Sequence, residues 1–188
     1  MRVLILFVAS LLFWSCRQHP KKLSAADYEK YLKLGDSLTS ETQKILLKNV
    51  SEQIAQNGVV QAVHFCNENA ISLTKKLEKE GIAISRLSDK NRNPKNEIQS
   101  QTDKQAWEKM TNLLTENQPK HFILEADGAV FYYKAIPLAM PTCLACHGNK
   151  QTDIQPEVQQ IITQKYPNDK ATNYKMGELR GLWKMKID

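Results

Sequence analysis

The 188-residue chain has little glycine, proline or cysteine, and its one long apolar run lies at the N-terminus. Seven glycines and seven prolines are too few for a collagen-like or low-complexity chain. Four cysteines are too few for a small disulfide scaffold, so each cysteine needs its own explanation. With 41% hydrophobic and 24% charged residues, the chain lies in the globular range and has the length of one ordinary domain.

The apolar run at residues 3–14 follows Arg2 and predicts an export signal. It is too short to span a bilayer, which takes ~20 helical residues. Ser15-Cys16 at its end resembles the lipobox of bacterial lipoproteins, in which the cysteine is lipidated and becomes N-terminal after cleavage. An uncleaved anchor or an ordinary signal remains an alternative, because bulky residues stand at positions 13 and 14.

These features divide the chain into a lipoprotein-type signal peptide at 1–15, a tether at 16–23 and a single domain at 24–188. We expect the protein on the periplasmic side of a bacterial membrane, anchored by lipid at Cys16. Cleavage before Cys16 removes one cation, Arg2, and takes the formal net charge from +6 to +5. The lysines are scattered and an exported protein meets no duplex, so the positive charge predicts a solvated surface and no nucleic-acid partner.

The mature chain begins with a pattern that predicts two long helices. Ser24 with Asp27 forms a helix start, and Asn57-Gly58 interrupts the apolar stripe that follows. A second helix is predicted from about 59 to 80, ended by Gly81, which accepts positive φ.

The remaining elements alternate between strand and helix without a regular βαβ repeat. Asp127-Gly128 favours a tight hairpin turn between two strand-prone runs. Strands are predicted at 82–87, 121–125, 129–136 and 182–187, and helices at 100–117 and 156–166. The predicted fold is therefore α+β, with long N-terminal helices packed beside a small antiparallel sheet.

Cys143-x-x-Cys146-His147 is the attachment signature of c-type haem. The two thiols add to the vinyl groups of one haem, and the adjoining imidazole faces the iron. Attachment of this kind takes place outside the cytoplasm, in agreement with the export signal. One covalently bound haem c is the predicted cofactor.

Cys143 and Cys146 have two alternative uses, a zinc site and a dithiol-redox site. With Cys66 and either His64 or His147 they would complete a four-ligand zinc set, but zinc sites commonly use paired short-spaced ligands. A dithiol-redox site would place the pair after a strand and at the start of a helix in a βαβ unit, and the sequence predicts no such unit. A zinc-binding or dithiol-redox lipoprotein is therefore the alternative reading.

Cys66 is the cysteine without an assigned partner. It lies on the apolar face of the second predicted helix, between the small residues Ala62 and Ala70, whereas His64 points about 200° away. Spacing alone leaves two uses open, a small core residue or the second axial ligand of the iron. Other candidate distal ligands are Met140, Met176, Met185 and His121, and an open five-coordinate iron is a further alternative.

Several segments together resemble the DUF3365, or Tll0287-like, group of exported single-haem proteins. The matching features are Cys66 on a helix, RLSDKNRNPKN at 86–96, PTCLACHG at 141–148 and YKMGELRG at 174–181. The resemblance covers most of the mature chain and implies a PAS-like sheet. It also implies that Cys66 is an axial ligand opposite His147.

Arg86, Arg92 and Arg180 are candidates to pair with the haem propionates, because guanidinium groups bind carboxylates in two-point geometry. Ordinary surface arginines are the alternative at each position. The aromatic residues Trp107, Phe131 and Tyr132 would line the pocket or, as such residues do more often, belong to the core.

A His/thiolate iron has a low reduction potential because the anionic sulfur stabilises the ferric state. Iron with both axial positions filled offers no site for substrate, so we do not expect an enzyme. The predicted roles are redox or small-gas sensing and low-potential electron transfer. Either role requires a redox partner or signalling protein in the periplasm.

Overall fold

The computed structural model describes residues 22–188. The predicted signal peptide and the lipidation site Cys16 lie outside the described residues. Within 22–188 no helix is long and apolar enough to cross a membrane.

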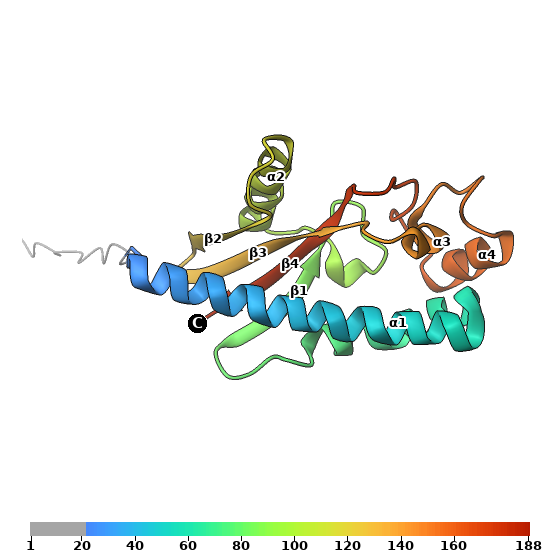
Figure 1. The fold of residues 1–188 in the computed structure, drawn as a ribbon, viewed down its shortest axis with the longest axis horizontal. Helices are drawn as coiled ribbons and strands as arrows, with labels where there is room; N and C mark the ends of the chain where they lie inside the picture. The colour runs from blue at the N-terminus through green and yellow to red at the C-terminus, as the bar shows by residue number, and fades with distance from the viewer. Residues whose placement is uncertain (1–21) are drawn as a thin grey trace, which may run out of the picture.

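The N-terminal part of the domain is a helical hairpin. Helix α1 (Ala25–Lys75) begins at Ser24, whose side chain accepts a hydrogen bond from the Asp27 amide at 3.1 Å. At Gly58 the backbone adopts φ +79° and ψ 171°, which a helix cannot contain, and the chain reverses direction (Figure 1). The two predicted helices are thus confirmed as arms 25–57 and 59–75, joined at the predicted break.

The predicted end of the second arm is wrong by five residues. The helix ends at Lys75, and Gly81 (φ +72°) lies in the turn before the first strand. Within this turn the Glu78 carboxylate accepts a hydrogen bond from the Ile84 amide at 2.8 Å. This hydrogen bond to the first strand holds Glu78 in the turn, although the sequence pattern alone would continue the helix to residue 80.

Four antiparallel strands form one sheet in the order β1-β4-β3-β2. They are β1 (Ile82–Leu87), β2 (His121–Ala126), β3 (Ala129–Pro137) and β4 (Leu179–Ile187). Asp127 and Gly128 both have positive φ, which forms the predicted tight turn between β2 and β3. Strand β4 begins three residues earlier than its alternating pattern suggests, because Gly181 pairs with Ile136 at the end of β3.

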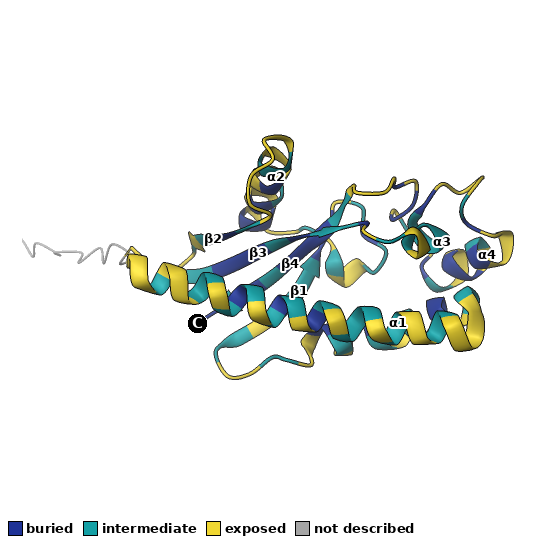
Figure 2. Ribbon diagram, viewed as in Figure 1, coloured by how far each residue is buried: buried dark blue, intermediate teal, exposed yellow. Residues whose placement is uncertain are grey.

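The two faces of the sheet are covered by different helices (Figures 1 and 2). Helix α2 (Gln101–Thr115), capped by Ser100, packs Ala106 and Met110 against Phe131 and its neighbours on one face. The first arm of α1 covers the other face. The buried residues on that face are Ile84, Ile123, Tyr132, Trp183, Met185 and Ile187. Phe131 and Tyr132 belong to the core, and Trp107 packs against it.

A smaller set of helices lies beyond the end of the sheet, near the bend of the helical hairpin (Figure 1). The motif residues form the 3-10 turn η2 (Pro141–Cys143) and one helical turn, α3 (Leu144–His147). Helix α4 (Pro156–Lys165) packs against Val63 on the second arm of α1. The predicted α+β architecture is confirmed, and the hairpin, the sheet end and these turns meet around one space.

A substitution at Gly35 tests the packing of α1 on the sheet. A Cβ atom at Gly35 would overlap the ring of Tyr132, which is fully buried. Glycine-to-alanine changes inside a helix usually stabilise by about 0.5–1 kcal/mol. Here overpacking should outweigh that gain, and we expect Gly35→Ala to lower the free energy of unfolding by ~1–3 kcal/mol in urea titrations. The exposed control Ser37→Ala should stay within ~0.5 kcal/mol, and a Gly35→Ala protein as stable as this control would refute the packing.

Candidate functional site

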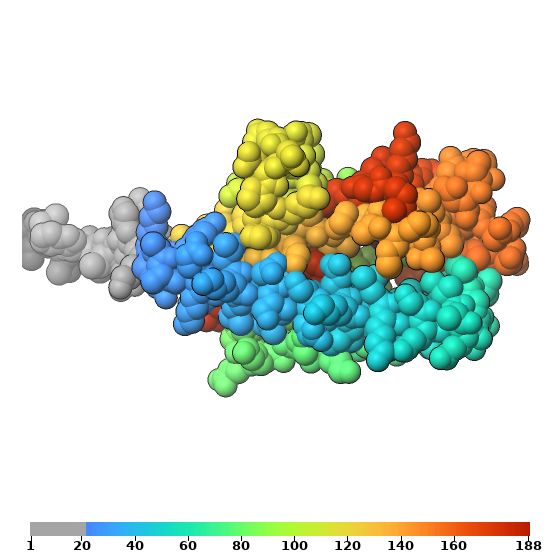
Figure 3. All heavy atoms as spheres, viewed as in Figure 1, coloured from blue at the N-terminus to red at the C-terminus, as the bar shows by residue number. Residues whose placement is uncertain are grey.

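A cavity of about 260 Å³ lies between the helical hairpin, the end of the sheet and the segment after β3. Figure 3 shows a hollow between α1 and this segment. The volume is close to the lower end of the range for small-molecule and cofactor sites, ~300–1,000 Å³. Apolar side chains from both arms of α1 form one wall, among them Leu46, Val50, Ile54, Ala62 and Ala70.

The three residues of the Cys143-x-x-Cys146-His147 motif line the opposite wall, and each is half-buried. Prolines at 137 and 141 bound the short segment that leads from β3 into the motif, and Pro141 opens the 3-10 turn η2. Cys143 and Cys146 are free thiols on neighbouring turns. The motif therefore presents two sulfurs and an imidazole to one cavity.

The imidazole of His147 is fixed by a backbone carbonyl. Its Nδ1 lies 2.8 Å from the oxygen of Ala171. A hydrogen bond to a carbonyl requires the proton on Nδ1, which leaves Nε2 with its lone pair. Burial lowers the pKa of His147 well below its usual value, and the charges of Arg92 and Arg180 lower it further. The ring is therefore neutral at neutral pH, the form that ligates metals.

Arg92 holds the loop around this imidazole. Its guanidinium lies 2.6 Å from the carbonyl oxygen of Cys146 and 3.2 Å from that of Ala171. Two further contacts of 3.1 Å join it to the carboxylate of Asp169, and both side chains are nearly buried, at 11% and 8% exposure. The guanidinium of Arg92 is thus already occupied by partners within the protein.

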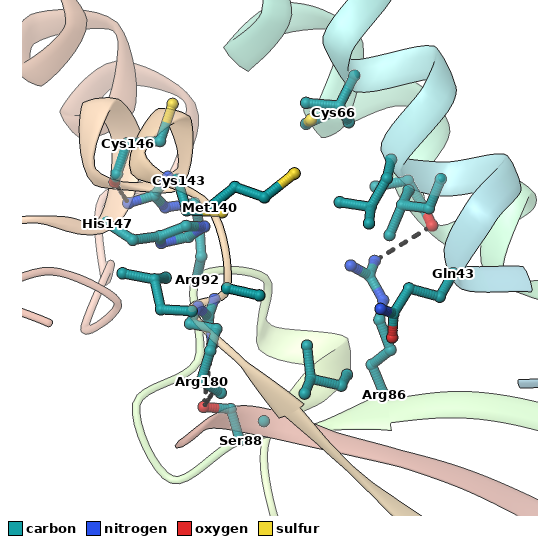
Figure 4. A pocket seen from close by; sticks show the side chains of 18 of the residues that line it. Gln43, Cys66, Arg86, Ser88, Arg92, Met140, Cys143, Cys146, His147 and Arg180 are labelled. Atoms are coloured by element: carbon teal, nitrogen blue, oxygen red, sulfur yellow. Dashed lines mark hydrogen bonds between the residues drawn. The ribbon is translucent and has the colours of Figure 1, made fainter. Parts of the chain in front are cut away.

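Cys66 lies on the second arm of α1, and Figure 4 shows it facing the motif across the cavity. Burial raises the pKa of its thiol to about 11, an effect that Cys146 reinforces and that Arg86 and Arg92 oppose. The thiol is therefore protonated at neutral pH in the protein alone. Small Ala62 and Ala70, one turn away on either side, keep the space beside the sulfur open.

Of the other candidate iron ligands, one lines the cavity and the others lie elsewhere in the fold. Met140 lines the cavity, whereas Met185 is fully buried in the sheet core and Met176 is exposed. His121 begins β2 and stacks on Tyr132 on the α1-covered face of the sheet, with 6.1 Å between ring centroids. Of the sulfur and imidazole groups considered, the cavity thus brings together Cys66, Met140 and the motif.

The zinc alternative finds no support in the geometry. Within residues 22–188 no three His, Cys, Asp or Glu side chains are grouped so that they could hold a metal ion. His64 is not among the described residues that line the cavity. The motif also follows an antiparallel strand and an irregular segment, not the strand of a βαβ unit that a dithiol-redox site favours.

Arg86 and Arg180 lie in the cavity wall, not on the outer surface. Arg86 donates to the Ala70 carbonyl at 3.2 Å, and Arg180 to the Ser88 hydroxyl at 3.1 Å. The Nε–H groups of both arginines are buried and find no hydrogen-bond acceptor among the described residues. Burial, together with the charge of Arg180, lowers the pKa of Arg86 to about 10. Two buried cations with unused donors favour an anionic ligand.

Several residues of the site carry no signal in the sequence. Trp183 lines the cavity from β4, where the alternating pattern indicates only a strand, and its Nε1 donates to Gln43 at 2.9 Å. Asp169 and Ala171, which support His147 and Arg92, lie in a loop without a recognisable motif. Their roles follow from the folding of this loop against the motif, which local sequence does not encode.

Fold and site together define an α+β protein in which a helical hairpin and a four-stranded sheet enclose a Cys-x-x-Cys-His cavity. The model of the Tll0287-like family, with the description Tll0287, matches residues 24–188, and the chain belongs to this family. A solved structure titled as that of the cyanobacterial haem protein Tll0287 superposes with a TM-score of 0.59. It is 21% identical and the match covers 84% of this chain and 94% of that chain, a likeness that shows the fold. No curated protein matches.

Proposed function

We propose that the chain is an exported c-type haem protein with one haem attached through Cys143 and Cys146. The observation that carries this proposal is the orientation of His147, whose Nδ1 is bound to Ala171 beside two free thiols in one cavity. Membership of a family with a structurally similar haem protein supports it.

The residues of the cavity fit the chemical character of haem. The macrocycle is flat and apolar, and the wall formed by α1 is apolar with small alanines around Cys66. Its two propionates are anions, and Arg86 and Arg180 each offer a buried Nε–H without an acceptor among residues 22–188. We assign these two arginines to the propionates, and Arg92, already paired with Asp169, to the support of the motif.

The motif residues act in distinct ways in this proposal. Cys143 and Cys146 would hold the haem by adding S–H across its vinyl double bonds, sulfur to one carbon and hydrogen to the other, which needs no external oxidant. His147 would hold the iron through Nε2, and Cys66 would offer its sulfur from the opposite wall. Although burial keeps the Cys66 thiol protonated, a coordinating metal displaces that proton. When bound, haem supplies a one-electron couple and a binding position for small gases.

We infer that the domain is a redox or small-gas sensor. Cys66 and His147 belong to different parts of the fold, so loss of the Cys66 ligand would remove one of the links between the second arm of α1 and the motif. Along the chain this arm is joined to the first arm through the bend at Gly58. Val63 packs it against α4, in a cluster that Cys146 also contacts, and its Ala70 carbonyl accepts a hydrogen bond from Arg86. The arm is therefore an element that ligand exchange could move.

Low-potential electron transfer is the second candidate. It is favoured by the rigid support of His147, through Ala171, Arg92 and Asp169, because an electron carrier gains from ligands that do not move. In both cases we propose attachment to the periplasmic side of a membrane through lipidated Cys16, a redox or signalling partner there, and no enzymatic activity.

The first test concerns the sixth ligand. In protein matured with haem-attachment machinery, we expect Cys66→Ala to abolish the thiolate features of the ferric absorption and electron paramagnetic resonance spectra. The matched control Met140→Leu changes the other sulfur side chain in the cavity that lies outside the motif and should leave these features intact. Unchanged ferric spectra in Cys66→Ala would remove Cys66 from the coordination sphere. If the unmodified protein shows no thiolate features and its spectrum changes in Met140→Leu, the ligand is the Met140 thioether.

Gas binding separates the two candidate roles. If the domain is a sensor, CO or NO should rapidly change the spectrum of the reduced protein, with loss of the sulfur ligand. Stopped-flow spectroscopy measures this change, and Cys66→Ala should bind CO faster because no ligand has to leave first. A six-coordinate spectrum that stays unaltered under CO and NO in both oxidation states would contradict small-gas sensing and support a purely redox role, either redox sensing or electron transfer.

A further inference from the structure

The carbonyl oxygen of Ala171 receives two donors at once. His147 Nδ1 lies 2.8 Å away and Arg92 Nη2 lies 3.2 Å away. We propose that Arg92 is a positioning residue that raises the reduction potential of the iron by competing with His147 for this carbonyl. The inference rests on the proposed haem ligation by His147.

The loop from Asp169 to Ala171 fixes this shared contact. The Ala171 amide donates to Asp169 Oδ1 at 2.9 Å, and the same carboxylate is bound by Arg92 through Nε and Nη2, each at 3.1 Å. Arg92 Nη2 also contacts the Cys146 carbonyl at 2.6 Å. The cation is therefore held between the residue before His147 and the acceptor of its Nδ1 proton, with little freedom to move.

The electronic effect follows from how outer hydrogen bonds act on metal ligands. An acceptor that draws on the Nδ1–H of a ligating histidine makes the imidazole a stronger donor to the metal. A carbonyl that also receives a cationic donor has less electron density to offer, so the imidazole becomes a weaker donor. A weaker donor stabilises the ferric state less, and the nearby positive charge disfavours that state further. Both effects raise the reduction potential of the iron, whereas the thiolate of Cys66 would lower it.

Asp169 is expected to affect the reduction potential in the opposite direction from Arg92. Its carboxylate pulls Arg92 toward itself and partly cancels its charge, so it limits the effect of Arg92 on the carbonyl. Removal of the carboxylate charge should therefore shift the potential upward, and removal of the guanidinium charge should shift it downward. A merely structural role of the pair would not produce opposite shifts, because either change would loosen the same loop.

The experiment uses the full chain with haem attached and the variants Arg92→Gln, Arg92→Lys and Asp169→Asn. Midpoint potentials come from spectroelectrochemistry, the donor strength of His147 from electron paramagnetic resonance g values, and folding from circular dichroism. We expect a lower potential in Arg92→Gln, a smaller shift in Arg92→Lys and a higher potential in Asp169→Asn, with g values that change in step.

Folded Arg92→Gln with unchanged potential and g values would overturn the inference, as would shifts of the same sign in Arg92→Gln and Asp169→Asn. If Arg92→Gln does not fold, an unchanged or lowered potential in Asp169→Asn overturns it. These outcomes differ from failure of the proposed function, in which the unmodified protein would carry no haem to titrate.

Discussion

The hydrogen bond between His147 Nδ1 and the Ala171 carbonyl decides which nitrogen of the imidazole faces the cavity. Without this hydrogen bond the imidazole could rotate, and the motif would not present a metal ligand in a fixed orientation beside its two thiols. The bond depends on the loop at 169–171, which Arg92 and Asp169 hold against the motif. A charged pair that is nearly buried, far from the motif in sequence, thus determines the geometry of the site.

The opposite wall depends on a different constraint, the reversal of α1 at Gly58. The reversal brings Cys66 to face the motif and places the apolar side of both arms around one space (Figure 4). The cavity also leaves the Nε–H groups of Arg86 and Arg180 without acceptors among the described residues. A buried unsatisfied donor costs about 1–3 kcal/mol, and more when the group is charged. Proteins tolerate this cost where a ligand satisfies the donors.

Much of this arrangement could be predicted from the sequence, because the relevant signals are local. The Ser24 and Ser100 caps, the break at Gly58 and the Asp127-Gly128 turn each depend on a few neighbouring residues. The position of Cys66 on an inward helix face followed from its spacing to Ala62 and Ala70. Contacts between distant segments could not be predicted. The early end of α1, the first residues of β4 and the support of His147 by Ala171 each depend on a partner that folding brings from elsewhere in the chain.

The central claim is that a porphyrin is bonded to Cys143 and Cys146, and a denaturing measurement tests it most directly. The full chain, matured with haem-attachment machinery, would be analysed by intact mass spectrometry after unfolding and by its alkaline pyridine spectrum. The account predicts a mass increase of one haem that survives denaturation, and the spectrum of a haem whose vinyl groups have become thioethers. A folded protein that is colourless, or one that releases all its haem into denaturant, would contradict it.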